Sequence, residues 1–210
     1  MQRIAPLNSL LLSLVVAGLT PAVSGQCDSA PQGLVSWWAG DGSGADSLGG
    51  PSVVLQNGAG FAPGFVTLGS GEAFHFDGVN DRSFVPANAT LNVNSATVQT
   101  WVKLDSAGAG TEPTIAVRES VFGLRHTTLL KPKLIFYTRN DAGTKLGSDG
   151  LMYMFQSLTA PTSIPTGVWT HLAGTYDDAT GAARIYLNGA LVAEQAVLAG
   201  RIRPDGTTST

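Results

Sequence analysis

Cysteine is nearly absent from this sequence, since Cys27 is the only one in 210 residues. An intradomain disulfide and a Cys-rich zinc site are therefore excluded, and the hydrophobic core must stabilise the fold. Two uses of Cys27 stay open. We favour a disulfide with a cysteine beyond the end of the chain, because Ser24, Gly25 and Gln26 do not match a bacterial lipobox and so argue against lipid attachment.

Charge is scarce as well. Charged residues make up 13% of the chain and the formal net charge is −3. The sequence therefore lacks the excess of positive charge that binding to nucleic acid or to an anionic membrane requires. No glutamate has a second acid two residues away on the same strand face; the four are Glu72, Glu112, Glu119 and Glu194. Glycoside hydrolysis needs two carboxylates about 5 to 9.5 Å apart, so we expect no catalysis. The histidines also lack zinc-ligand spacing; they are His75, His126 and His171.

Long apolar helical runs are missing from residues 26–210, whereas Gly (26) and Pro (11) are plentiful. This balance predicts many short strands joined by turns. Strand signals occur at residues 33–40, 71–78, 96–105, 133–139 and 151–158. The run ATVQTWVKLD (96–105) alternates most clearly, with Val98, Val102 and Leu104 on one face and Gln99, Trp101 and Lys103 on the other.

The stretch GVWTHLAGTYDDATGAARIYLNGALVAEQ (167–195) predicts three consecutive antiparallel strands. Two apolar runs flank Asn188-Gly189, the strongest local signal for a type I′ hairpin. In the first strand, Leu172 and Tyr176 share one face. Trp169 and His171 lie on the other face, and we expect both to be packed and hydrogen-bonded rather than to form a binding surface.

The N-terminus has the pattern of a secretory leader. Arg3 precedes a short apolar run, and small residues follow it, so we expect a signal peptide over residues 1–25 with cleavage between Gly25 and Gln26. The apolar run has ten residues and a bilayer span needs about 20, which argues against the alternative of a retained membrane anchor. The mature chain is therefore expected outside the cell and free of the membrane.

Four segments together resemble a known family. The runs GLVSWWAGDGSGADSLGG, AFHFDGVNDRSFVP, TVQTWVKLD and VWTHLAGTYDDATGAARIYLNGALV resemble, in order and spacing, the LamG-like jelly-roll domains of the concanavalin A-like lectin/glucanase superfamily. The resemblance implies an all-β fold, a two-sheet antiparallel β-sandwich over residues 26–210. The pattern Glu-x-Asp-x-x-Glu, typical of the family's glucanases, is not found.

Calcium is the most reasonable metal for such a chain, because Ca²⁺ takes six to eight oxygen ligands from carboxylates, amides and carbonyls. Two loops offer these donors, with candidates Asp41 and Asp46 in one and Asp77, Asn80 and Asp81 in the other. The resemblance points to Asp77 as the best single candidate. The alternative is that these side chains cap their own turns.

The resemblance implies a secreted, non-catalytic recognition or adhesion module that binds a carbohydrate or an extracellular protein, with or without calcium. The alternative is a structural spacer in a larger secreted or cell-surface protein, and a glycoside hydrolase is a weaker third possibility. Exposed aromatic rings favour binding, since sugars stack on them. The rings to test are Trp37, Trp38, Tyr153 and Phe155.

The end of the chain departs from the family pattern. After the Asn188-Gly189 hairpin, family members have a further strand that returns beside the first one, whereas this chain ends in GRIRPDGTTST. The segment around Leu34 to Trp38 would then be an unpaired apolar edge, which is an aggregation hazard. We therefore expect a domain that lacks its last strand and belongs to a longer polypeptide. Residues 26–210 alone should be poorly soluble, and about 30 to 40 further native residues should restore folding.

Overall fold

The computed structural model describes residues 30–65, 71–108, 110, 112–118, 121–147 and 149–204. The chain divides into two compact units, Met1–Leu34 and Val35–Thr210. In the described part of the first unit, the Leu34 N–H donates to the Pro31 carbonyl oxygen over 3.1 Å. The predicted leader, the cleavage position at Gly25 and Gln26, and Cys27 lie outside the described residues, as does Glu119.

The second unit is built from short strands. They are β1 (Val54–Gln56), β2 (Gly60–Pro63), β3 (Glu72–His75), β4 (Arg82–Phe84), β5 (Ala96–Val102), β6 (Thr114–Arg118), β7 (Phe122–His126), β8 (Pro132–Arg139), β9 (Lys145–Leu146), β10 (Met152–Thr159), β11 (Thr170–Tyr176), β12 (Ala182–Leu187) and β13 (Ala190–Ala196). The described residues contain one turn of 3₁₀-helix, Ala89–Leu91, and no α-helix. None of their helices is long and apolar enough to cross a membrane.

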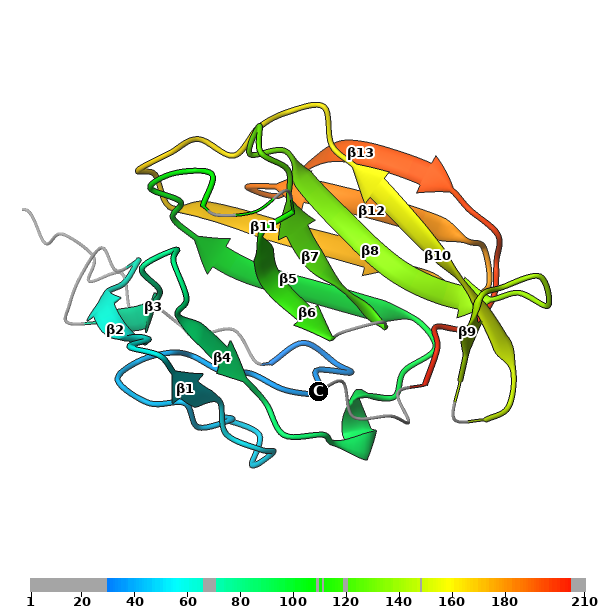
Figure 1. Ribbon diagram of the computed structural model, residues 1–210, viewed down its shortest axis with the longest axis horizontal. Helices are drawn as coiled ribbons and strands as arrows, with labels where there is room; N and C mark the ends of the chain where they lie inside the picture. The colour runs from blue at the N-terminus through cyan, green and yellow to red at the C-terminus, as the bar shows by residue number, and fades with distance from the viewer. Residues whose placement is uncertain are drawn as a thin grey trace, which may run out of the picture. The chain divides into compact units, whose positions relative to one another are not determined.

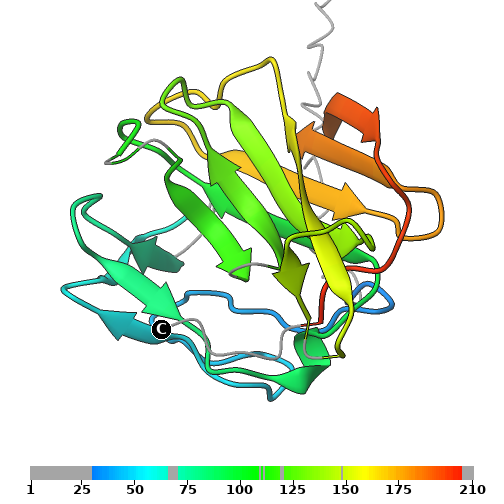
Figure 2. The ribbon, with the colours of Figure 1, turned by 45° about the vertical axis from the view of Figure 1, so that its right-hand side comes forward.

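Two antiparallel sheets carry most of the unit. One has five strands in the order β6-β7-β8-β10-β9, and the other has four in the order β13-β12-β11-β5. Figures 1 and 2 show the two sheets face to face, while the separate ribbons β1-β4 and β2-β3 lie to one side of them. The predicted two-sheet β-sandwich is confirmed, and so is the meander β11-β12-β13.

The core lies between the two sheets. Alternating residues of β11 and β12 point into it, as do alternating residues of β7 and β8; Leu124, Leu134, Phe136, Leu172, Tyr176 and Ile185 are all 2% exposed or less. The rings of Phe136 and Tyr176 stack across the gap with centroids 4.7 Å apart. Each sheet has one apolar face, and packing the two faces against each other removes both from water. This burial stabilises the sandwich relative to two separate sheets.

The predicted strand at residues 33–40 does not form. With the residues that the structure describes, its only strand-like pairing is an isolated bridge between Trp38 and Asp46. The Trp37 N–H donates to the Asp46 carboxylate over 3.0 Å, and the Ser47 N–H donates to the Trp37 carbonyl over 2.8 Å. The Asp46 side chain and the Ser47 N–H thus provide the hydrogen-bond partners of the Trp37 backbone that a neighbouring strand would otherwise provide.

The segment at residues 201–203 packs into the larger sheet, although the sequence shows no strand signal there. Ile202 bridges Thr138 at the end of β8 and is 1% exposed. Two backbone bonds flank it, from the Arg139 N–H to the Arg201 carbonyl and from the Arg203 N–H to the Tyr137 carbonyl. The expected absence of a last strand stays a prediction, but this short run takes part in the fold.

Candidate functional site

The outer face of the four-stranded sheet presents the largest group of surface rings in the described part of the chain. Strands β5 and β11 pair so that Trp101 lies directly opposite His171. Along β5 the inward residues are half-buried and the outward ones exposed, as the alternation of residues 96–105 predicts. Trp101 therefore points away from the core, on the same face as Gln99.

Four rings meet on this face and form what we call the aromatic cluster: Phe65, Trp101, Trp169 and His171. Phe65 stacks on Trp101 with centroids 4.1 Å apart and planes at 14°. Trp169 lies 6.5 Å from Phe65, and His171 lies 5.4 Å from Trp101, both with tilted rings. Phe65 and Trp101 remain 47% and 46% exposed, so nearly half of each side chain is open to solvent.

The aromatic cluster borders a hollow of about 650 Å³, and Asn188 completes its lining. Asn188 belongs to the turn between β12 and β13, where it has φ 49° and Gly189 has φ 80°. Both positive values confirm the predicted type I′ hairpin. The turn is also tied to β11, because the Asn188 N–H donates to the His171 carbonyl over 2.8 Å and the His171 N–H donates to Asn188 Oδ1 over 2.9 Å. A turn signal in the sequence thus places a polar side chain beside the rings.

Charge at this site comes from Lys103. Its ammonium nitrogen lies 5.7 Å from the centre of the Trp169 ring, which is within the range of a cation–π contact. None of the residues that line the hollow is a carboxylate. Farther along the sheet, the Arg184 guanidinium is neutralised by Glu194 over 2.7 Å.

The expectation that Trp169 and His171 are packed away is met only in part. Both are half-buried, and both line the hollow. The sequence does not predict that Phe65 belongs to this site. It follows β2 and reaches Trp101 only through the tertiary fold, so no sequence signal near it could have identified it.

The rings singled out from the sequence fall into three groups. Trp37 is exposed, and Phe155 is exposed with its ring edge-on to Tyr137 at 5.3 Å. Trp38 is half-buried, with its indole N–H donating to the Pro51 carbonyl over 2.9 Å. Tyr153 is fully buried, and its hydroxyl donates to the Asp149 carboxylate over 2.7 Å. None of the four belongs to the aromatic cluster, so the best candidate surface lies elsewhere.

The best calcium candidate, Asp77, caps its own turn. Its Oδ1 atom accepts from the N–H groups of Val79, Asn80 and Asp81 over 2.8, 3.3 and 3.4 Å. Hydrogen bonds from the backbone, led by that of Val79, hold the pKa of Asp77 below its usual value. Asp81 completes the turn by accepting from the Asp77 N–H over 2.9 Å. This is the turn-capping alternative that the sequence left open.

The other loop uses its carboxylates in the same way. Asp41 accepts from the Glu72 N–H over 2.8 Å. Asp46 is buried and accepts from the N–H groups of Trp37 and Leu48 over 3.0 and 2.9 Å. Within the described ranges, no group of three or more His, Cys, Asp or Glu side chains could hold a metal ion. This donor geometry does not favour calcium, and the calcium site stays a prediction.

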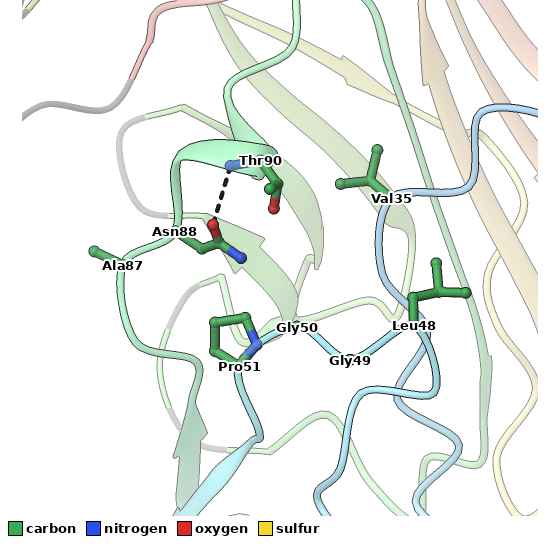
Figure 3. Close-up of a pocket in the computed structure, with 8 residues that line it drawn as sticks. All are labelled: Val35, Leu48, Gly49, Gly50, Pro51, Ala87, Asn88 and Thr90. Carbon is green, nitrogen blue, oxygen red and sulfur yellow. Dashed lines mark hydrogen bonds between the residues drawn. The ribbon is translucent and has the colours of Figure 1, made fainter.

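A second hollow of about 550 Å³ lies near the 3₁₀ turn. Figure 3 shows Val35 and Leu48 on one side of it and Asn88 and Thr90 on the other. The Thr90 N–H donates to Asn88 Oδ1 over 3.1 Å, which caps the turn. This lining has no aromatic ring and no charge, so it offers a ligand less than the aromatic cluster does.

Comparison with known proteins gives one family match. The family model described as the concanavalin A-like lectin/glucanases superfamily matches residues 77–210. No curated protein matches the chain. Among solved structures, a similar one is that of domain 4 of AbnA, a GH43 extracellular arabinanase from Geobacillus stearothermophilus, in complex with arabinotriose. It is 17% identical, with a TM-score of 0.48, and the match covers 83% of this chain and 86% of that chain.

Proposed function

The chain belongs to the concanavalin A-like lectin/glucanase superfamily, and from this premise we propose that it is a secreted, non-catalytic module that binds carbohydrate on the outer face of its four-stranded sheet. One observation carries the proposal. The aromatic cluster keeps two stacked rings nearly half exposed beside a hollow, although such rings are normally buried. The leader-like residues 1–25 support an extracellular location.

The lining of the hollow suits a sugar. A sugar ring has an apolar face of C–H groups that packs against an aromatic ring, and its edge carries hydroxyl groups that need hydrogen-bond partners. Phe65 and Trp101 offer the rings, and Asn188, whose Oδ1 atom accepts from the His171 N–H, offers its amide N–H groups. Gln99 does not line the hollow, but its exposed amide lies on the same face of β5 as Trp101. Apolar surface and a few polar groups therefore occur together, as in small-molecule sites generally.

The same lining argues against catalysis. Glycoside hydrolysis requires an acid and a nucleophile or base, which are both carboxyl groups in most families. The hollow is lined by Phe65, Trp101, Trp169, His171 and Asn188, and none of these can supply a carboxylate. We infer that a sugar bound there would be held without being cleaved.

A spacer function is the second candidate, and one observation favours it. One face of Trp101 is covered by Phe65, and Lys103 lies over Trp169. In this case the aromatic cluster packs the segment around Phe65 against the sheet and binds no ligand. The substitution Trp101→Ala distinguishes the two functions. It should lower the stability of the fold if the ring serves packing, and lower the affinity for the ligand if the ring serves binding.

A glycan array identifies a ligand, and calorimetric titration of Trp101→Ala then tests the site. Loss of a half-exposed indole should weaken binding about tenfold or more, on the order of 1.4 kcal/mol. Trp37→Ala is the matched control, because Trp37 is 54% exposed against 46% for Trp101 but lies outside the aromatic cluster. Running the array with and without EDTA shows whether calcium takes part.

The outcomes separate the two functions. Selective loss of affinity in Trp101→Ala, with a melting temperature close to that of the native chain, supports carbohydrate binding. If no glycan is retained with or without EDTA, and Trp101→Ala only lowers the melting temperature, the spacer function replaces it. An equal loss of affinity in Trp37→Ala would place the binding surface elsewhere.

A further inference from the structure

The two main sheets end in four edge strands, β5, β6, β9 and β13, and only β5 lacks a feature that prevents pairing with another chain. Such features are short length, bulges and charge. β13 has a register shift in its pairing with β12, and its Glu194 is bonded to Arg184. β9 has two residues, one of them a lysine, and β6 has a register shift and ends at Arg118. The seven residues of β5, ATVQTWV, are uncharged and pair with β11 without a shift.

The outer edge of β5 presents the backbone groups of Thr97, Gln99 and Trp101. The N–H and C=O groups of His171 point toward β12, where they bond the side chain and the backbone of Asn188. This direction alternates along a strand, so the even-numbered residues of β11 bond their even-numbered partners in β5. The odd-numbered residues of β5 therefore point their N–H and C=O groups away from β11. Among the strands that the structure describes, β5 has no second partner.

Burial indicates that this edge is also open at the side of the core. The core-facing residues of β11 are buried, whereas those of β5, such as Val98 and Val102, are only half-buried. A strand added beside β5 would therefore cover apolar side chains in addition to bonding the backbone.

The sequence of β5 is complementary to itself when two copies run antiparallel about Gln99. Gln99 then lies opposite its own counterpart, and the two amide side chains can bond each other. Thr97 lies opposite Trp101 of the partner copy. Pairs of a β-branched and an aromatic residue are favourable across strands, so the side chains of this face suit the pairing.

The charges at the two ends of this pairing are complementary as well. Lys103 lies opposite Ser95 of the partner copy. Within each chain the Ser95 hydroxyl donates to the Asp178 carboxylate and accepts from the Asp178 N–H over 2.9 Å. The ammonium group of one copy would therefore lie near a carboxylate of the other, on both sides of the axis. Asp105, the next charged residue after Lys103, lies opposite Val93, so no two like charges are directly opposed.

We propose that two copies of this chain associate edge to edge through β5, so that their four-stranded sheets become one continuous antiparallel sheet about a two-fold axis at Gln99. The assembly closes at two copies, because each copy contributes the same strand. The pairing does not depend on a glycan. Since the axis is perpendicular to the sheet, both aromatic clusters lie on one face of the dimer, where a single polymer can engage both and gain avidity.

Sedimentation equilibrium of the native chain tests the pairing without any ligand, over a concentration series in the micromolar range. Gln99→Lys places two positive charges opposite each other at the axis, and Gln99→Glu places two negative ones there. Gln195→Lys is the matched control, because Gln195 is an exposed residue of β13, at the opposite edge of the same sheet. Far-ultraviolet circular dichroism checks that each variant keeps the β fold.

We expect a monomer–dimer equilibrium for the native chain and for Gln195→Lys. Gln99→Lys and Gln99→Glu should each weaken the dimer about tenfold or more, because like charges meet in it. An equal mixture of the two variants should dimerise again, since opposite charges then meet at the axis. A mixture that associates no better than either variant alone overturns the axis at Gln99. A native chain that stays monomeric, assembles beyond two copies, or responds equally to Gln99→Lys and Gln195→Lys overturns the proposal.

Discussion

Gly174 sets how closely the two sheets approach, and replacing it by alanine tests this. Gly174 lies in β11, in register between Val98 and Ile185. A Cβ atom there would lie 2.7 Å from Leu134 Cδ1 and 3.0 Å from Leu124 Cδ2, in the facing sheet. Both distances are well below van der Waals contact. Both leucine side chains are fully buried, so neither can move aside freely.

The expected cost follows from two opposing effects. Inserting a methyl group into a packed core costs about 1 to 3 kcal/mol. Replacing glycine by alanine also restricts the unfolded chain, which returns about 0.4 to 1 kcal/mol. Gly174→Ala should therefore lower the free energy of unfolding by roughly 1 to 2 kcal/mol. For a chain of this size the melting temperature should fall by about 2 to 8 °C.

Urea unfolding followed by tryptophan fluorescence measures this change, with Gly60→Ala as the control. Gly60 lies in β2 without a positive φ, and the nearest atom to its added Cβ would be the Gly58 carbonyl oxygen at 3.9 Å. That variant should be as stable as the native chain or slightly more stable.

A double-mutant cycle with Leu134→Ala completes the test. Removing the leucine opens the space that the new methyl group needs, so Gly174→Ala should cost nothing in that background. If Gly174→Ala costs nothing in the native background, or costs the same in both, the contact with Leu134 does not determine the distance between the sheets.

Three further predictions concern a buried tyrosine, a turn and the segment near the end of the described chain. Burial, together with the charges of Asp178 and Asp177, raises the pKa of Tyr176 to about 12. The neutral hydroxyl is thus favoured in the fold, so the stability it contributes is complete below pH 10 and is lost as the pH rises toward 12. Between pH 10 and 12 the free energy of unfolding of the native chain should fall by about 3 kcal/mol more than that of Tyr176→Phe in urea titrations, and equal pH profiles would contradict the assignment. If calcium binds at Asp77, millimolar calcium should raise the melting temperature of the native chain but not of Asp77→Ala; no rise in the native chain counts against the site. Ile202→Ala should cost about 2 to 5 kcal/mol in urea unfolding, because Ile202 is buried against β8, whereas a change below 0.5 kcal/mol would show that this segment is peripheral.

Local chemistry determined much of this protein in advance. Asn188 and Gly189 predict a hairpin because both tolerate positive φ, and the structure has it. The alternation of residues 96–105 predicts which side chains of β5 point outward, since successive side chains of a strand alternate between faces. These features depend on residues close together in the sequence, so the sequence alone is sufficient to identify them.

The site depended on contacts that no local pattern contains. The alternation of the strand residues predicts that Trp101 and Trp169 point away from the core. Whether side chains on such a face are exposed or covered depends on which other segments of the chain pack over it. Phe65 reaches Trp101 from a separate ribbon, and residues 33–40 form no strand because Asp46 binds their backbone instead. Burial and side-chain capping are properties of the whole packed molecule, so only the tertiary structure could decide where the rings would be exposed.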